Sequence, residues 1–227
     1  VDGVLSRHFN RHVSLFVSRL IVDTPITPNH MTIVTFAIAL VGAWFATRGS
    51  YVDVVVAAAL MQLASILDGC DGELARVRFQ GSRLGQWLDT VGDDASNVIF
   101  WAALAIGARA SGQPDWVVWS GVVAAIANGL AALQNYWLLA KIGSGDFYAL
   151  QADGDEPKTG IVAWVVRAIS LLLKQDAFLM LVLVLALAGV LYPAMSFIAL
   201  GAVVTLGAST VRTLRSMRAR VAGQKTK

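Results

Sequence analysis

Charged residues and cysteines are scarce in this sequence of 227 residues. Lys, Arg, Asp and Glu make up 15% of it and hydrophobic residues 56%, and the mean hydropathy is +0.64, which is too apolar for a soluble domain of this length. Cys70 is the single cysteine, so an intrachain disulfide framework and a cysteine-based metal site are both excluded. Cys70 itself is interpreted as a small buried filler.

Six apolar runs recur along the chain, and most approach the ~20 residues that a membrane-spanning helix needs. They cover residues 31–47, 52–67, 87–108, 116–140, 177–191 and 194–209. Several runs contain Gly, Ser, Gln or Asn, which favours helices packed on one another around a polar interior. The predicted fold is therefore an all-α integral membrane protein of about six transmembrane helices.

An amphipathic helix is predicted before the first run, within residues 4–22. Its apolar side chains recur at steps of three or four residues: Leu5, Phe9, Val13, Phe16 and Leu20. This spacing is typical of a helix lying in the membrane interface. Pro25 and Pro28 then end it, and Asn29 is the predicted cap of the first span. Residues 161–173, which include Arg167, have the same interfacial pattern.

The distribution of Arg and Lys predicts the orientation. Most lie on one side of the predicted spans, and only Arg48 and Arg109 fall on the other. Because cytoplasmic loops retain Lys and Arg, both termini are predicted in the cytoplasm of a protein of the cell inner membrane. This rule also explains the basic tail after Arg212, so we expect no nucleic-acid partner. A charged segment precedes the first span, so we expect no cleavable signal peptide. The start at Val1 indicates a domain of a longer protein.

Four aspartates fall within two adjacent predicted spans, where a carboxylate is costly and therefore indicates function. Asp68 and Asp71 share one helix face, and Asp89 and Asp93 share another. A hairpin that turns near residues 79–82 can bring the four together at the cytoplasmic end. Close carboxylates repel unless a cation joins them, and carboxylate oxygens suit Mg²⁺ or Mn²⁺. We expect two ions shared among the four acids.

Glycines and an arginine surround these acids. Glycines at positions 69, 72, 81 and 85 let a phosphate approach the backbone closely, and Arg76 can pair with a phosphate or a carboxylate. Each feature has a second interpretation, because membrane carboxylates also line cation pathways and glycines also permit close helix packing. A cation-coupled transporter is therefore the alternative to a diphosphate-binding enzyme, although no internal repeat of the kind found in transporters is evident.

The spacing of these residues resembles the complete signature of the CDP-alcohol phosphotransferase family. The matching positions are Asp68-x-x-Asp71-Gly72-x-x-Ala75-Arg76, then eight residues, then Gly85-x-x-x-Asp89-x-x-x-Asp93. The resemblance implies transfer of a phospho-alcohol from a CDP-alcohol to an acceptor hydroxyl, with release of CMP. The sequence is expected to divide into 1–26 as interfacial amphipathic helix, 27–220 as six-helix catalytic transmembrane domain and 221–227 as basic cytoplasmic tail, an order that also resembles the family. A homodimer is the expected assembly.

The resemblance also implies roles for individual residues. Asp68, Asp71 and Asp89 are the expected metal ligands, and Asp93 is expected to be both a ligand and the general base. The expected contacts of the cytidine diphosphate are Gly72, Ala75, Arg76, Ser82 and Gly85. Asp94 competes with Asp93 for the role of base, but one residue further on it is turned about 100° off the acidic face. Glu73 is also off that face and is predicted to meet solvent or an arginine.

The substrates are predicted from a shorter stretch of sequence. The segment 2–29, with Asp-Gly-x-x-Ser-Arg-x-x-Asn-Arg-x-x-Ser and Thr-Pro-x-Thr-Pro-Asn, resembles the di-myo-inositol-phosphate-phosphate synthase branch. The resemblance implies CDP-inositol as donor, inositol phosphate as acceptor and a preceding cytidylyltransferase domain. A lipid synthase using CDP-diacylglycerol is the alternative. The acceptor's phosphate needs cations. The candidates are Lys141, Arg167, Lys174 and Arg212. His8, His12 and His30 are interpreted as headgroup contacts.

Overall fold

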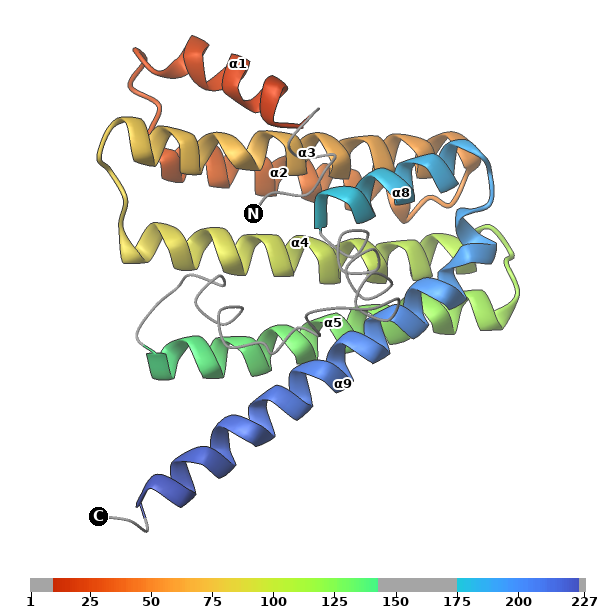
Figure 1. Cartoon of the computed structure of the whole chain (residues 1–227). Helices are drawn as coiled ribbons and strands as arrows, with labels where there is room; N and C mark the ends of the chain where they lie inside the picture. The colour runs from red at the N-terminus through yellow and green to blue at the C-terminus, as the bar shows by residue number, and fades with distance from the viewer. Residues whose placement is uncertain (1–9, 143–174, 225–227) are drawn as a thin grey trace, which may run out of the picture.

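All regular structure in residues 10–142 and 175–224, the part of the chain that a computed structural model describes, is α-helical (Figure 1). The helices are α1 (Arg11–Ile21), α2 (Pro28–Ala46), α3 (Tyr51–Val77), α4 (Arg83–Ala110), α5 (Asp115–Ile142), α8 (Gln175–Leu187) and α9 (Leu191–Gln224). The predicted all-α class is confirmed. The second interfacial segment, residues 161–173, lies outside the described residues.

The start of α2 differs from the prediction. Thr27 is its N-cap: the Thr27 hydroxyl accepts the His30 N–H at 3.3 Å, and the Thr27 N–H donates to His30 Nδ1 at 3.2 Å. Pro28 takes the first helical position, where its fixed φ suits the helix and its missing N–H costs nothing. The prediction of Asn29 as the cap was therefore wrong by two residues. His30, which was interpreted as a headgroup contact, belongs to the capping box.

Helices α2, α3, α4 and α5 run side by side, α8 lies along α3, and α9 crosses α5 obliquely (Figure 1). The main apolar core joins alanines and a few large side chains at the end of the bundle away from the α3–α4 turn, with Phe100, Trp101 and Leu104 fully buried. The helices approach closely there: a Cβ at Gly107 would lie 2.0 Å from the Ala46 carbonyl oxygen.

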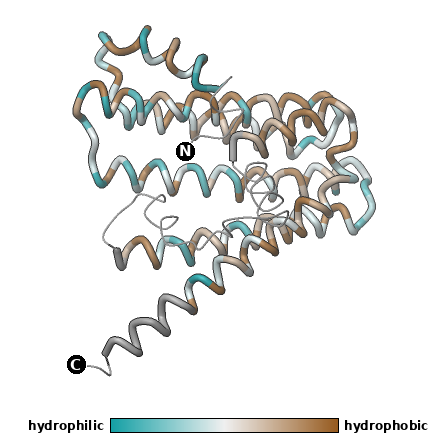
Figure 2. Tube along the Cα trace, viewed as in Figure 1, coloured by the Kyte–Doolittle hydropathy of each residue, from teal (hydrophilic) through white to brown (hydrophobic). Residues whose placement is uncertain are grey.

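Four described helices are long and apolar enough to cross a bilayer: Pro28–Ala46, Tyr51–Val77, Asp115–Ala140 and Leu191–Leu214. The protein is thus an integral membrane protein by the length and composition of its helices. The count of six stays a prediction, because α4 carries Asp89, Asp93 and Asp94 in its first half and the apolar stretch of α8 is short (Figure 2).

Helix α1 lies outside the bundle against α3 (Figure 1). Its small polar residues Ser14 and Ser18 are buried, whereas Leu15, Phe16 and Leu20 are exposed. These three large apolar side chains face away from the protein, which is the arrangement that a helix in the membrane interface needs. Val17 and Ile21 instead pack against the buried cluster around Leu74.

Candidate active site

The signature residues lie on a hairpin of two helices, as predicted. Helix α3 ends at Val77 and α4 begins at Arg83. The turn is closed by the Gln80 N–H, which donates to the Ala75 carbonyl at 3.0 Å, and Phe79 adopts a positive φ of 55°. Ser82 is the N-cap of α4 and accepts the Gly85 N–H at 2.9 Å. This turn sets the two acidic faces opposite each other.

Three of the four predicted acids converge. Carboxylate oxygens of Asp68, Asp71 and Asp89 all lie within 4.8 Å of one another, and all three residues are half-buried. Thr32 of α2 donates a hydrogen bond to Asp71 Oδ2 at 2.6 Å. Asp89 Oδ1 is buried and accepts no hydrogen bond within the described part of the chain.

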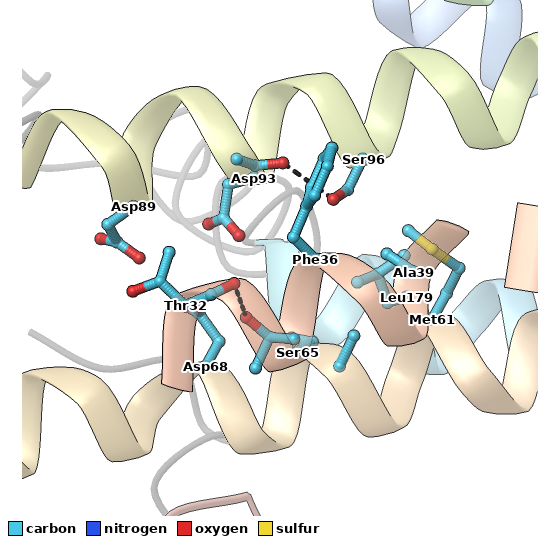
Figure 3. A pocket seen from close by; sticks show the side chains of 13 residues that line it. Thr32, Phe36, Ala39, Met61, Ser65, Asp68, Asp89, Asp93, Ser96 and Leu179 are labelled. Carbon is cyan, nitrogen blue, oxygen red and sulfur yellow. Dashed lines mark hydrogen bonds between the residues drawn. The ribbon is translucent and has the colours of Figure 1, made fainter. Parts of the chain in front are cut away.

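Asp93 lies beside these three rather than among them. It lines a small cavity of about 20 Å³ together with Asp68 and Asp89. Figure 3 shows Asp89 and Asp93 descending from α4 toward Asp68 on α3, with Thr32 of α2 between them. Ser65 and Ser96 also line this cavity. Asp93 can therefore act on a group held at the acidic cluster.

A larger cavity of about 300 Å³, the donor cavity, opens beside the acids. It is lined by Pro28, Asn29, Thr32, Asp71, Gly72, Ala75, Arg76, Gln80, Gly81, Ser82, Gly85, Gln86 and Asp89. Every residue expected from the resemblance to contact the cytidine diphosphate is among them. Asp89 and Thr32 line both cavities, so the acidic cluster lies where the two meet.

The glycines near the acids differ in which atoms lie close to their Cα. A Cβ at Gly72 would meet only the Arg76 guanidinium, at 3.4 Å and beyond, so the space above it is cavity. A Cβ at Gly85 would lie 3.0 Å from Asn29 Oδ1, which indicates close approach of α2 and α4. The prediction that Gly69 admits a phosphate was wrong, because a Cβ there would meet Ser14 of α1 instead.

Four polar residues of the donor cavity were missed from the sequence: Asn29, Thr32, Gln80 and Gln86. Asn29 and Thr32 occupy the first turns of an apolar helix, a position where a polar side chain can serve either a cap or a site. The glutamines are ordinary polar residues in and after a turn. Only the packing of α2 against the hairpin shows that these four face one space.

Two other carboxylates have partners that spacing did not reveal. Glu73 was predicted to meet solvent or an arginine, which is wrong: it is buried and accepts hydrogen bonds from the hydroxyls of Ser14 at 2.9 Å and Ser18 at 2.7 Å. Asp94 turns away from both cavities and accepts a hydrogen bond from Tyr136 of α5.

Of the four candidates for binding the acceptor's phosphate, the structure describes the side chain of Arg212. Arg212 is exposed on α9 and lines neither cavity. Lys141 belongs to the last turn of α5, but its side chain lies outside the described residues, as do Arg167 and Lys174. Among the histidines, His12 is exposed on α1, and His8 also lies outside the described part.

The acidic cluster fits a hard divalent cation. Three carboxylates in mutual reach repel one another in a poorly solvated site, and a cation removes that repulsion. The buried Asp89 Oδ1, which accepts no hydrogen bond within the described residues, is available as a ligand oxygen. Oxygen ligands alone suit Mg²⁺ or Mn²⁺, and among the described residues neither Cys70 nor a histidine joins the cluster.

Comparison with known proteins supports the chemistry that these residues indicate. The model of the CDP-alcohol phosphatidyltransferase family matches residues 25–206. The "Bifunctional IPC transferase and DIPP synthase" of Thermococcus kodakarensis is 42% identical over 115 residues, which are 51% of this chain and 25% of that protein. The protein of the same name in Aquifex aeolicus is 37% identical over 125 residues, 55% of this chain and 27% of that protein. The chain therefore matches about a quarter of the length of these relatives.

A solved structure shares the fold. The crystal structure of Mycobacterium tuberculosis phosphatidylinositol phosphate synthase with CDP-DAG bound superposes with a TM-score of 0.64 at 17% identity. The superposition covers 89% of this chain and 94% of that one. At this identity the likeness extends to the arrangement of the helices alone.

Proposed function

Because the chain belongs to the CDP-alcohol phosphatidyltransferase family, we propose that it transfers a phospho-alcohol group from a CDP-alcohol to an acceptor hydroxyl and releases CMP. The observation that carries this proposal is the donor cavity. It brings Gly72, Ala75, Arg76, Ser82 and Gly85 to one space that borders the acidic cluster. The small side chains allow a diphosphate to reach the helix backbone, and the Arg76 guanidinium suits a phosphate oxygen.

Each acid has a role in this reaction. Asp68, Asp71 and Asp89 would hold Mg²⁺ or Mn²⁺, and with Asp93 the set has enough oxygens for two ions. The bound cations supply neutralisation of charge on the bridging and leaving phosphate oxygens. Thr32, by donating to Asp71 Oδ2, fixes that carboxylate in one orientation.

Asp93 is the proposed base. It accepts the proton of the acceptor hydroxyl, whose oxygen forms a bond to the β-phosphorus of the donor. The bond between that phosphorus and the bridging oxygen breaks in line, and CMP leaves with the electron pair. The position of Asp93 in the small cavity, beside the cluster rather than within it, supports this role.

We propose CDP-inositol as donor and inositol phosphate as acceptor. The resemblance of segment 2–29 supports this choice, as do relatives named DIPP synthase in several organisms. The solved relative holds CDP-DAG, so the lipid donor is the alternative to be tested. A cytoplasmic site, a homodimer and acceptor binding by Lys141 or Arg212 stay predictions.

The purified chain should be supplied with Mg²⁺ and inositol phosphate, and with CDP-inositol or CDP-diacylglycerol in parallel, and CMP should be measured. We expect CMP from CDP-inositol and a loss of about 10³-fold in Asp93→Asn, the size of effect that removal of a general base produces. Exclusive use of the lipid donor would contradict the substrate proposal. Cation flux in vesicles without any release of CMP would contradict the enzyme itself.

A further inference from the structure

Helix α4 presents two faces to two different neighbours. Gly85, Asp89 and Asp93, at steps of four, line the cavities between α4, α2 and α3. Trp87 and Asp94 are seven residues apart and therefore share another face, toward α5. Because the helix is rigid, a contact that fixes the face of α4 toward α5 also sets the direction in which Asp89 and Asp93 point.

The catalytic half of α4 has one small apolar contact, where Trp87 packs against the buried Leu138 and Leu139 of α5. All the buried residues of this helix lie between Phe100 and Ala108, in the half that joins the main core. The half that carries Asp89 and Asp93 is only partly buried. Its rotation about the helix axis must therefore be set by a few specific contacts.

Tyr136 supplies two such contacts at once. Its ring meets Trp87 edge to face, with centroids 5.9 Å apart and an interplanar angle of 65°, and its hydroxyl donates a hydrogen bond to Asp94. The two contact points lie about 10 Å apart along α4, at a rise of 1.5 Å per residue. One side chain of α5 thus holds the catalytic half of α4 at two levels.

Helix α5 is itself anchored at this level. The two residues before Tyr136 bond to α9: Gln134 Nε2 donates to Thr210 Oγ1 at 2.9 Å, and the Ser209 hydroxyl donates to Asn135 Oδ1 at 3.3 Å. The position of Tyr136 is therefore fixed by a second helix, so it can serve as a reference point for α4.

We propose that Tyr136 is a positioning residue that, through Asp94 and Trp87, aims Asp93 at the acceptor hydroxyl. This inference rests on the proposed function, in which Asp93 takes the proton of that hydroxyl. It assigns to Asp94 a role as acceptor of the Tyr136 hydrogen bond rather than as a base. Small misplacements of a reacting group are costly, about 10²-fold for one ångström.

The first test removes the hydroxyl alone in Tyr136→Phe. We expect kcat for CMP release to fall about tenfold, within the range that misplacement produces, with the donor's KM and Kd unchanged. Tyr51→Phe is the matched control, because it also removes one hydrogen bond between helices, from the Tyr51 hydroxyl to the Leu187 carbonyl at 2.8 Å, at the far end of the bundle. A normal kcat in Tyr136→Phe would overturn the proposal, as would a loss of thermal stability or donor binding beyond that of the control.

The second test separates positioning from proton transfer. Asp94→Asn keeps an oxygen that can accept the Tyr136 hydroxyl, so most activity should remain. Asp94→Leu should match Tyr136→Phe, and the double variant should lose no more than either single one. Inactive Asp94→Asn with intact donor binding would overturn the proposal in favour of Asp94 as base. A wild-type chain that releases no CMP refutes the proposed function, whereas active Tyr136→Phe beside inactive Asp93→Asn refutes only this inference.

Discussion

Gly69 and Gly72 lie three positions apart on α3 but have different surroundings. The space above Gly72 belongs to the donor cavity, whereas Gly69 lies against Ser14 of α1. Neither position is closed to a methyl group by rigid atoms, since the nearest neighbours are side chains at 3.4 Å or more. We therefore expect the two positions to differ in contact with the proposed donor rather than in their effect on folding.

This pair yields a prediction for donor binding. Gly72→Ala should weaken the binding of a CDP-alcohol about tenfold, or ~1.4 kcal/mol, because the methyl group stands where the diphosphate approaches the backbone. Gly69→Ala should bind the donor normally, and both variants should gain the small helix preference of alanine. Equilibrium binding to purified variants checks this, and equal affinities in the two would contradict the placement of the diphosphate.

At the scale of elements, α1 is held on α3 by buried hydrogen bonds beside a small apolar contact, in which Val17 and Ile21 pack against the cluster of Cys70 and Leu74. Glu73 receives the hydroxyls of Ser14 and Ser18. Arg78, just after α3, donates to carbonyls at the end of α1 and in the connection to α2, those of Ile21, Val22, Thr24 and Ile26. The helix that carries Asp68 and Asp71 thus ends on the residue that fixes the entry into α2.

Arg78→Lys tests this connection. A lysine keeps the charge but lacks the planar fork that reaches several carbonyls, so the connection should lose about 2 kcal/mol of local stability. Amide hydrogen exchange in residues 21–27 should accelerate accordingly. Arg83→Lys, at an exposed position that begins α4, is the control. Equal exchange rates in both variants would show that the connection is stable without the hydrogen bonds of Arg78.

At the scale of the whole molecule, the helices and the acidic hairpin could be predicted because their signals are local. Apolar runs mark the helices, and the cost of a carboxylate among apolar residues marks the site wherever it lies. The partners of Glu73 could not be predicted, because Ser14 and Ser18 lie more than fifty residues earlier in the chain. The same limit applies to Asn29: it faces the donor cavity only once α2 is packed on the hairpin.

Membership in the family and the reaction class followed from the same local spacing, since eight residues at fixed intervals fall within one hairpin. The number of membrane spans could not be predicted from the sequence in the same way. Hydropathy alone does not decide whether α4 and the 13-residue α8 cross the bilayer. Helix α4 carries acids that neighbouring helices must shield from lipid, and α8 is shorter than a full span. Substrate choice depends on contacts with a ligand, which spacing within the chain does not encode.

The apolar core and the acidic cluster occupy opposite ends of the same helices, and this separation predicts the response to heat. The end held by Phe100, Trp101 and Leu104 should stay packed while the other end, which has the smaller apolar clusters around Leu74 and Leu139, opens. Release of CMP should therefore fail several degrees below the transition reported by tryptophan fluorescence, at about the shift that 1 kcal/mol produces in a protein of this size. Coincident temperatures would refute this.

Such a protein would lose its chemistry while still looking folded, so a stability screen based on unfolding alone would select the wrong variants and the wrong detergents. In the proposed reaction Mg²⁺ and a CDP-alcohol would bind at the end that opens first, so adding them should bring the two temperatures together.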